Sequence, residues 1–358
     1  MSAPAVRYLL QTRAGFERDA WQEVEPWLLE RGVETRLAEL VEQGGFLLVD
    51  AADSQPALNW STLAFTRQLC RVVADVELGE RDRLTPLLAA LRSRGTPFGS
   101  VWLEVPDTND GKSLSSFTRK FQPLLEEGLT AAGLLDAGSR RRLHVYFPHK
   151  GRAILGVSQG DEAAPWPMGI LRLRMPAEAP SRSTLKLAEA FEVFLGRDGQ
   201  RDRLKEGMTA VDLGAAPGGW TWQLIRRGIK TYAIDNGPMK GACDGHPLVK
   251  HLRADGFRYR PQHPVDWLVC DMVEQPARVS DLIAAWFVGG LTRQAIFNLK
   301  LPMKKRALAL RDALDRIGDA LDAAEIRHTV AVKQLYHDRE EVTVYLARVG
   351  GKTRGKRG

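Results

Sequence analysis

A glycine-rich segment of the chain has the residue types and spacing of a ligand-binding turn. Asp212-Leu-Gly-Ala-Ala-Pro-Gly-Gly219 lies between a strand-like apolar run and a helix-like run. Glycines there let the backbone approach a ligand closely, and the first turn of the helix offers free N–H groups. Asp235 ends the next predicted strand about 20 residues beyond Gly214, which suits a carboxylate bound to ribose hydroxyls. Asp255, after another short strand-like run, is a candidate for an adenine amine. A tight turn alone is the simpler alternative, but the strand, helix and acids together favour a nucleotide-type ligand.

The class of ligand is narrowed by the details of this turn and of another strand end. The Asp212-Leu-Gly opening and the Ala-Pro-Gly-Gly219 close differ from the GxGxxG of dehydrogenases and are similar to the first motif of class I methyltransferases. Enzymes that methylate base amines typically carry Asn/Asp-Pro-Pro-aromatic after the fourth strand, where this chain has Cys270-Asp271-Met272-Val273. Methylation of a base amine is therefore disfavoured. Cys270 lies inside an apolar strand, so we expect it in the core rather than as a nucleophile.

These residues require a scaffold of alternating strands and helices in the second half of the chain. Apolar runs predict strands, and helical periodicity predicts helices between them. The predicted strands are 209–214, 230–235, 265–271 and 295–300, the helices are 220–228, 279–290 and 304–323, and 328–337 with 340–349 form a closing antiparallel pair. This order predicts an α/β fold with a mostly parallel sheet whose ligands lie at the carboxyl ends of the strands.

The first half of the chain has an α+β pattern without an evident catalytic constellation. Its predicted strands are 6–12, 45–51, 100–105 and 143–147, and its predicted helices are 16–32 and 115–133. The halves divide around residues 160–182, where Pro165, Pro167, Pro176 and Pro180 fit neither a long helix nor a central strand.

Composition limits the class of protein further. A chain of 358 residues with 44% hydrophobic content suits two or three soluble modules. It has no apolar run long enough for a transmembrane helix and no signal-peptide layout, and its three cysteines lack metal or disulfide spacing, so we expect a cytoplasmic protein without a metal. The net charge of +7 favours a polyanionic partner, although a basic solvated surface would give the same total. Basic residues cluster at 119–120, 140–142, 304–306 and 352–357.

Six ordered segments of the second half resemble one family. The segments are SRSTLKLAEAF, DLGAAPGGWT, AIDNGPM, CDMVEQPA, FNLKLPMKKR and QLYHDREEVTV, and EVPDTND with FTRKFQPL extends the likeness to the first half. Together they resemble the RlmM-type 23S rRNA cytidine 2′-O-ribose methyltransferases. The resemblance implies a ferredoxin-like piece at 1–55, a THUMP-type RNA-binding domain at 56–160, a linker at 161–180, and a Rossmann-like S-adenosylmethionine-dependent methyltransferase domain at 181–358. It also implies 23S rRNA as the partner, either naked or in an early large-subunit precursor, and we expect a monomer.

The resemblance further implies a Lys-Asp-Lys-Glu tetrad, which matches Lys186, Asp271, Lys300 and Glu341 here. Glu340 is the rival for the last position. We hypothesise that Lys300 is the general base and that Lys186 tunes its pKa or stabilises the site. In this hypothesis Asp271 and Glu341 position the two lysines. A lysine base must be neutral, and so its pKa must fall below the usual value of about 10.4. Burial and Lys186 would lower that pKa, whereas each carboxylate would raise it.

Contacts to the methyl donor are carried over in the same way, to Ser183, Gly214, Ala216, Pro217, Gly218, Gly219, Asp235, Asp255 and Asp271. Ser183 has an alternative role as a helix N-cap. Trp220 and Trp222 are expected to pack in the core, and His337 to be a structural loop residue. For RNA contact in the first half the candidates are Phe117, Arg119, Lys120 and Phe121.

Three other functions remain open at this point. The first is a 2′-O-methylase of a different RNA nucleotide, and the second is a non-catalytic RNA-binding ribosome-assembly factor with a vestigial donor pocket. A dehydrogenase is the weakest, because the chain lacks a hydride-transfer His or Tyr constellation.

Overall fold

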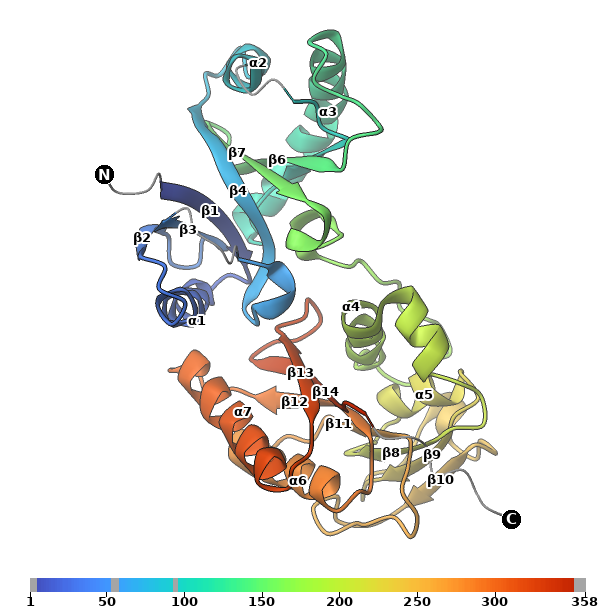
Figure 1. The fold of residues 1–358 in the computed structure, drawn as a ribbon. Coiled ribbons are helices and arrows are strands. Elements are labelled where there is room, and N and C mark those ends of the chain that lie inside the picture. The colour runs from blue at the N-terminus through green and yellow to red at the C-terminus, as the bar shows by residue number, and fades with distance from the viewer. Residues whose placement is uncertain (1–4, 53–57, 93–95, 351–358) are drawn as a thin grey trace. The chain divides into compact units, whose positions relative to one another are not determined.

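The computed structural model describes residues 5–52, 58–92 and 96–350. The chain forms two compact units, Met1–Ile170 and Leu171–Gly358. Each has its own sheet (Figure 1). Each also has its own hydrophobic core. The junction between the units lies among the four prolines of residues 160–182.

The N-terminal unit is built on a seven-stranded sheet in the order β2-β3-β1-β4-β7-β6-β5. All neighbouring strands are antiparallel except the β5–β6 pair. The strands are β1 (Ala5–Thr12), β2 (Thr35–Leu40), β3 (Phe46–Ala52), β4 (Thr66–Glu77), β5 (Ser100–Glu104), β6 (Arg141–His149) and β7 (Arg152–Gln159). The helices are α1 (Glu17–Leu29), α2 (Leu84–Arg92) and α3 (Asn109–Ala131), with short 3-10 turns η1 (Trp60–Thr62), η2 (Gly160–Glu162) and η3 (Pro167–Gly169).

The predicted elements of this half correspond to β1, β3, β5, β6, α1 and α3, but β2, β4, β7 and α2 went unrecognised. Strand β7 shows why: Gly156 interrupts its apolar run and resembles a strand breaker. In the structure a Cβ at Gly156 would lie 2.2 Å from Cys70 Sγ on β4. The glycine therefore permits close contact between neighbouring strands.

The C-terminal unit has a seven-stranded sheet in the order β10-β9-β8-β11-β12-β14-β13. Strands β8 to β12 are parallel, and β14 is antiparallel to both of its neighbours. The strands are β8 (Thr209–Leu213), β9 (Lys230–Ile234), β10 (Val249–Leu252), β11 (Trp267–Cys270), β12 (Gln294–Lys300), β13 (His328–Lys333) and β14 (Glu341–Arg348). The helices are α4 (Thr184–Arg203), α5 (Gly219–Ile225), α6 (Pro276–Val288) and α7 (Arg306–Ala323), and η4 (Gly241–Cys243) is a 3-10 turn. The predicted α/β class with a mostly parallel sheet is confirmed.

Strand order fixes where a ligand can bind in this unit. From β8 the chain runs outward through β9 and β10, and it then returns to the other side of β8 with β11 and β12. The crevice at such a reversal lies at the carboxyl ends of the two central strands. Here those ends are Leu213 and Cys270, which directly precede the glycine-rich turn and Asp271.

Buried side chains hold this sheet against its helices. Phe191 of α4 packs edge-on against Trp267 of β11, with ring centroids 6.0 Å apart, and Trp267 lies 6.2 Å from Tyr345 of β14. Helix α4 thereby packs against the sheet near β11 and β14, and Lys186 lies in the first turn of this helix. Within the described ranges, no helix is both long and apolar enough to cross a bilayer.

Candidate active site

The pairing of the last strands brings two charged residues of the predicted site together. In the antiparallel register of β12 and β14, Lys300 lies opposite Glu341 and Asn298 lies opposite Thr343. Residues two apart on a strand share a face. All four side chains therefore lie on one face, next to Asp271 at the end of β11.

Four charged side chains form a closed ring at this edge of the sheet. Lys300 Nζ lies 2.7 Å from Asp271 Oδ1, and Lys186 Nζ lies 3.4 Å from Asp271 Oδ2. Glu341 contacts both amines, Lys186 through Oε1 and Lys300 through Oε2. The four side chains are only 7–21% exposed. Each charge of the ring faces two opposite charges, which offsets part of the cost of removing it from water.

Glu340, the rival for the last acid, faces elsewhere. Its Oε2 accepts hydrogen bonds from Arg306 Nε at 3.1 Å and from Arg306 Nη2 at 2.7 Å. Its side chain is half exposed, whereas that of Glu341 is buried. Adjacent strand residues point to opposite faces, so only one glutamate of the pair can reach the lysines.

The pKa of Lys300 is raised in this arrangement. Burial is the largest single influence and lowers the pKa, but the charges and hydrogen bonds of Asp271 and Glu341 together outweigh it. The fall expected for a lysine base is therefore absent from the ring as it stands. Lys300 holds its proton until the charges around it change.

A second line of polar residues, which sequence analysis missed, holds Asp271 in place. Asn298 Nδ2 donates to Asp271 Oδ1 at 2.9 Å, and Thr343 Oγ1 donates to Asn298 Oδ1 at 2.8 Å. Thr343 Oγ1 also lies 3.0 Å from Asp338 Oδ2. The strand period contained the signal, because Asn298 precedes Lys300 by two residues and Thr343 follows Glu341 by two.

The hydroxyl of Thr343 can donate its single proton to either neighbour, Asn298 Oδ1 or Asp338 Oδ2. Asp338 Oδ2 also accepts the backbone N–H of Leu335 at 3.0 Å. Burial, together with Glu341 and Glu189, raises the pKa of Asp338 well above its usual value. The chain Asp338–Thr343–Asn298–Asp271 thus connects a buried carboxyl group to the ring through side-chain hydrogen bonds.

Thr343→Val should interrupt this line without changing side-chain volume much. We expect kcat of a reaction that uses the four charged side chains of the ring to fall about tenfold. The reason is that a buried polar group left unsatisfied costs about 1–3 kcal/mol. Thr343→Ser, which keeps the hydroxyl, is the matched control and should retain near-normal kcat. Kinetics with both variants provide the check, and equal activity of Val and Ser at this position would contradict the assignment.

The glycine-rich turn forms a cradle beside the ring. Gly214 and Gly218 have φ values of +78° and +118°, which side-chain-bearing residues rarely adopt. A Cβ at Gly214 would lie 2.8 Å from Met272 Cγ, so the turn has no room for one. Asp235 Oδ2 accepts from the backbone N–H of Ala216 at 3.0 Å, and its Oδ1 accepts from that of Gly237 at 2.7 Å. The carboxylate is thereby fixed against the turn.

Two cavities follow this cradle. One, of about 560 Å³, includes Gly214, Ala216, Asp235, Asp255 and Asp271 in its lining. A second, of about 280 Å³, is lined by residues of the turn, by Asp271 and by the segment before α4: Ser181, Ser183, Gly214, Ala215, Ala216, Pro217, Trp220 and Asp271. Because they share Gly214, Ala216 and Asp271, one elongated ligand can span both cavities and pass Asp271 on the way.

The residues present fit S-adenosylmethionine. Asp235 and Asp255 offer carboxylates for ribose hydroxyls and for the adenine amine, and the serines offer hydroxyls to a polar amino-acid end. Ser183 makes no capping hydrogen bond, and its Oγ lies 2.7 Å from Ser181 Oγ. Cavity lining is therefore the role that the geometry of Ser183 supports.

Two glycines of the predicted donor set, Gly218 and Gly219, line neither cavity. Gly218 is the residue before α5. A Cβ on Gly219 would lie 2.2 Å from Ser183 Oγ. Gly219 therefore lets α5 pack closely against the segment before α4, whereas a Cβ at Gly218 would lie 2.9 Å from Cys243 Sγ.

Several structural roles expected from the sequence are confirmed by burial. Trp220, Trp222 and Cys270 lie in the core. His337 Nδ1 lies 2.6 Å from Glu189 Oε2, which also accepts the backbone N–H of His337. Glu189 therefore fixes the loop before β14.

The RNA-contact candidates of the N-terminal unit divide into two groups. Phe121 is buried and Phe117 partly buried, and they stack on each other in the core with centroids 5.4 Å apart. The expectation that Phe121 contacts RNA is therefore wrong, whereas the partly exposed Phe117 stays a candidate. Arg119 and Lys120 are exposed on the same helix.

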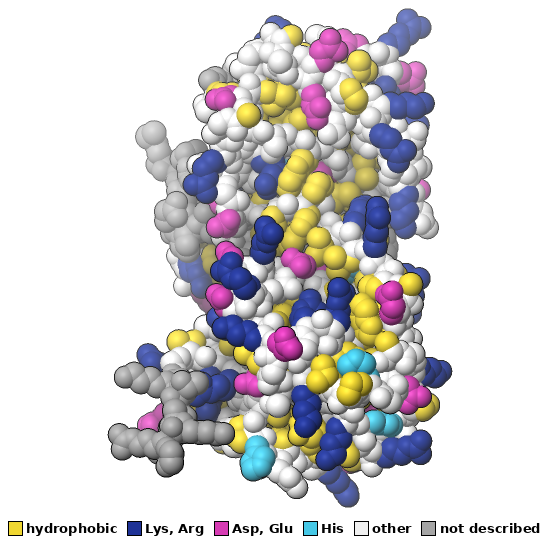
Figure 2. All heavy atoms as spheres, turned by 90° about the vertical axis from the view of Figure 1, so that its right-hand side faces the viewer, with side chains coloured by type: hydrophobic (Ala, Val, Ile, Leu, Met, Phe, Trp, Pro, Cys, Tyr) yellow, Lys and Arg dark blue, Asp and Glu magenta, His cyan; other side chains and the backbone are white. Residues whose placement is uncertain are grey.

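Lys and Arg side chains are scattered over the face of the molecule drawn in Figure 2, with Asp and Glu among them. The predicted basic cluster at 352–357 lies outside the described residues.

Asp212, the first residue of the glycine-rich motif, is fully buried beneath the cradle. Its Oδ2 accepts from Thr221 Oγ1 at 2.7 Å, and its Oδ1 has no hydrogen-bond partner among the described residues. Burial, the largest cause, raises the pKa of Asp212 to about 7 from an ordinary 3.8. The unfolded chain ionises this group at lower pH than the folded chain does, so stability from Asp212 is lost as the pH rises from about 4 to 7.

Asp212→Asn should remove this pH dependence, because the amide cannot ionise. We expect the variant to gain stability relative to wild type as the pH rises from 5 to 8, by about 3 kcal/mol. Thermal unfolding at both pH values measures the difference. Asp319→Asn, at an exposed position of α7, is the control. A variant-to-wild-type difference that does not change with pH would contradict the raised pKa.

Comparisons with known proteins point to one family. Residues 82–159 match the family model described as "Ribosomal RNA large subunit methyltransferase M, N-terminal", and residues 179–322 match "FtsJ-like methyltransferase". The second match contains Lys186, Asp271, Lys300 and the glycine-rich turn.

Curated relatives are similar over nearly the whole chain. A protein of Laribacter hongkongensis named ribosomal RNA large subunit methyltransferase M is 63% identical over 354 residues, 99% of this chain and 100% of that protein. Proteins of the same name from Pseudomonas syringae pv. tomato and Pseudomonas putida are 50% and 48% identical, over 85% and 96% of this chain and 86% and 99% of their own lengths.

Proposed function

Because the chain belongs to the ribosomal RNA large subunit methyltransferase M family, we propose that it transfers the methyl group of S-adenosylmethionine to the ribose 2′-hydroxyl of a cytidine in 23S rRNA. The observation that carries this proposal is the closed ring of Lys186, Asp271, Lys300 and Glu341 beside the glycine cradle. Once Lys300 has released its own proton, a ring of two amines and two carboxylates can take up and hold the proton of a hydroxyl next to a bound methyl donor.

The reaction requires alignment and removal of one proton. S-adenosylmethionine supplies, when bound, a methyl group that is activated by its sulfonium. In the proposed mechanism Lys300 Nζ, in its neutral form, accepts the proton of the 2′-hydroxyl as the oxygen–methyl bond forms and the sulfur–methyl bond breaks. Asp271 and Glu341 orient the two amines, and Lys186 balances their charge. Alignment contributes much of the acceleration, because a bound hydroxyl is already placed for attack.

The N-terminal unit is the part of the chain that we propose binds RNA. We keep the division into a ferredoxin-like piece at 1–55, a THUMP-type domain at 56–160 and a linker at 161–180 as part of this proposal. Strands from both sides of residue 55 form one sheet, in which β4 pairs with β1 and with β7. The proposal includes a monomer that acts in the cytoplasm on naked 23S rRNA or on an early precursor.

The experiment that tests the function offers the protein labelled S-adenosylmethionine with undermodified 23S rRNA and with tRNA. Products are mapped by the resistance of the 2′-O-methylated linkage to alkaline cleavage. The proposal requires a single resistant cytidine in 23S rRNA. A resistant linkage at another nucleotide would identify a different 2′-O-methylase, and donor binding without transfer to either RNA would favour a non-catalytic assembly factor.

A further inference from the structure

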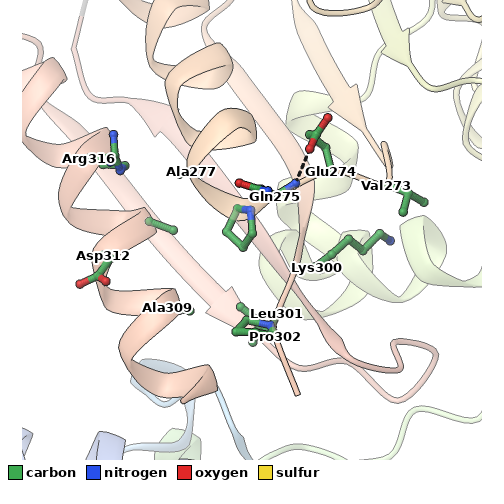
Figure 3. Close-up of a pocket in the computed structure, with 12 residues that line it drawn as sticks. Val273, Glu274, Gln275, Ala277, Lys300, Leu301, Pro302, Ala309, Asp312 and Arg316 are labelled. Carbon is green, nitrogen blue, oxygen red and sulfur yellow. Dashed lines mark hydrogen bonds between the residues drawn. The ribbon is translucent and has the colours of Figure 1, made fainter. Parts of the chain in front are cut away.

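A groove of about 550 Å³ opens beside Lys300, outside the two donor cavities. It lies between the start of α6 and the Ala309–Arg316 part of α7, and Leu301 and Pro302 line it between the two helices (Figure 3). The volume falls within the range of small-ligand pockets. Lys300 of the ring lines this groove, but none of the residues assigned above to the donor does.

The groove adjoins the reaction centre at two points. Lys300 is part of its lining, and Figure 3 shows the amine of Lys300 pointing away from Asp312 and Arg316. Val273 lines both this groove and the larger donor cavity. A group held in the groove therefore lies next to the side chain of Lys300, and the groove meets the larger donor cavity at Val273.

The walls suit a flat ring with a polar edge. Small or flat apolar residues line both sides: Pro276, Ala277, Leu301, Pro302, Ala309 and Ala313. Asp312 and Arg316 come from successive turns of α7 and offer an acceptor next to a donor. Val273 at the shared rim is 88% exposed, so its side chain is accessible to a group bound in either cavity.

The polar residues of the groove differ in how they are engaged. Glu274 accepts hydrogen bonds from Arg278 and from the backbone N–H of Gln275. Arg316 pairs with Asp281 at 3.3 Å, but both side chains are more than half exposed and the guanidinium has further N–H groups. Among the described residues, the exposed side chain of Asp312 has no partner in a hydrogen bond or an ion pair. Asp312 is therefore the carboxylate available to an incoming donor group.

We propose that this groove binds the base of the nucleotide being methylated, and that Asp312 selects cytosine by accepting a hydrogen bond from its exocyclic amine. This inference rests on the proposed function and names the substrate class of the same site. Cytosine presents an amine donor beside ring acceptors, which match Asp312 and Arg316 in turn. Uracil has a carbonyl oxygen in place of the amine, and that oxygen would face the carboxylate of Asp312. A base turned out of its stack and held on its pairing edge is a usual way to recognise RNA.

The selectivity is tested with two matched 23S rRNA transcripts that carry cytidine or uridine at the position modified by the wild-type protein. We expect Asp312→Asn to lower kcat/KM on the cytidine transcript about tenfold and to reduce the preference for cytidine over uridine by a similar factor. Asp315→Asn is the matched control, because Asp315 is exposed on the same helix and does not line the groove. The control should behave as wild type.

A second variant tests occupancy of the groove rather than base choice. Ala309→Trp should fill the groove and lower kcat/KM at least about a hundredfold, with donor affinity within twofold of wild type. Ala323→Trp, at the exposed last residue of α7, should leave both values unchanged. Donor affinity measured by calorimetry shows whether each variant is folded. If Ala309→Trp no longer binds the donor, its loss of activity does not bear on the groove, and Asp312→Asn alone decides the proposal.

The outcomes separate this inference from the proposed function. A wild-type protein that methylates no RNA overturns both. An active wild type with Asp312→Asn indistinguishable from Asp315→Asn overturns only the groove assignment. An equal loss on both transcripts also overturns it, because Asp312 would then contact RNA away from the base.

Discussion

Lys300→Ala is expected to lower kcat/KM for RNA methylation by about a thousandfold or more and to leave the affinity for S-adenosylmethionine within about twofold. Proton transfer by a positioned side chain contributes roughly 10²–10⁴-fold to a rate. Removal of Lys300 also leaves Asp271 and Glu341, two largely buried carboxylates, with one cation between them. The donor cavities do not include Lys300 in their lining, so donor binding should survive. Single-turnover methyl transfer and calorimetry measure the two quantities.

Two further variants separate the base from the charge. Lys300→Arg keeps a cation in the ring, but a guanidinium is never neutral in a protein and cannot act as the base. We therefore expect this variant to be as inactive as Lys300→Ala. Lys205→Ala, at an exposed site before β8, should match wild type. Full activity of Lys300→Arg would assign Lys300 an electrostatic role and would remove it as the base.

The raised pKa of Lys300 gives this reaction a pH dependence of known sign. Below that pKa the neutral fraction of the amine grows tenfold with each pH unit. The single-turnover rate of the wild-type protein should thus rise about tenfold per unit between pH 6 and 8. A rate that is flat over this interval would show that the proton leaves before the chemical step or by another route.

Asp235→Ala should weaken binding of S-adenosylmethionine about a hundredfold. Two charge-assisted hydrogen bonds to ribose hydroxyls are worth about 1.5 kcal/mol each at the lower end, and about 3 kcal/mol corresponds to roughly two orders of magnitude in Kd. Asp235 also holds the backbone N–H groups of Ala216 and Gly237, so its loss releases the turn itself. Calorimetric titration with the donor gives the answer.

The control for this change is Asp244→Asn, which alters a charge at an exposed position beyond β9. Its donor affinity should equal that of the wild type. If Asp235→Ala bound the donor as tightly as Asp244→Asn did, the larger cavity would not be the nucleoside site. The glycine cradle would then need another ligand.

Short-range patterns predicted most of the C-terminal unit, because each element there has a clear period or a clear boundary. The alternation of apolar strands and amphipathic helices predicted β8, β9, β11 and β12 close to their observed bounds. The last pair was less accurate, since β13 ends at Lys333 and the loop that follows is held by Glu189. The contact of Glu189 with this loop joins residues far apart in the chain, so no local sequence pattern predicts it.

The residues of the candidate site could be predicted from the sequence, but the direction in which the pKa of Lys300 shifts could not. Family motifs and strand ends pointed to Lys300, Asp271 and Glu341. Whether burial or carboxylates dominate the pKa of Lys300 depends on distances of a few ångströms, which only the fold determines. The polar line through Asn298 and Thr343 was accessible in principle from the two-residue period. The groove was not, because its walls come from two helices that meet only in the folded unit.

The order of strands in the sheet also sets the moment at which the protein becomes an enzyme. β14 is the last strand of the sheet to be synthesised, yet it enters between β12 and β13 and contributes Glu341 directly opposite Lys300. A nascent chain that has completed β8 to β12 can fold the cradle for the donor, but it lacks the acid that joins the two lysines. The four-residue ring can therefore be complete only after β14 has been synthesised and has paired with β12.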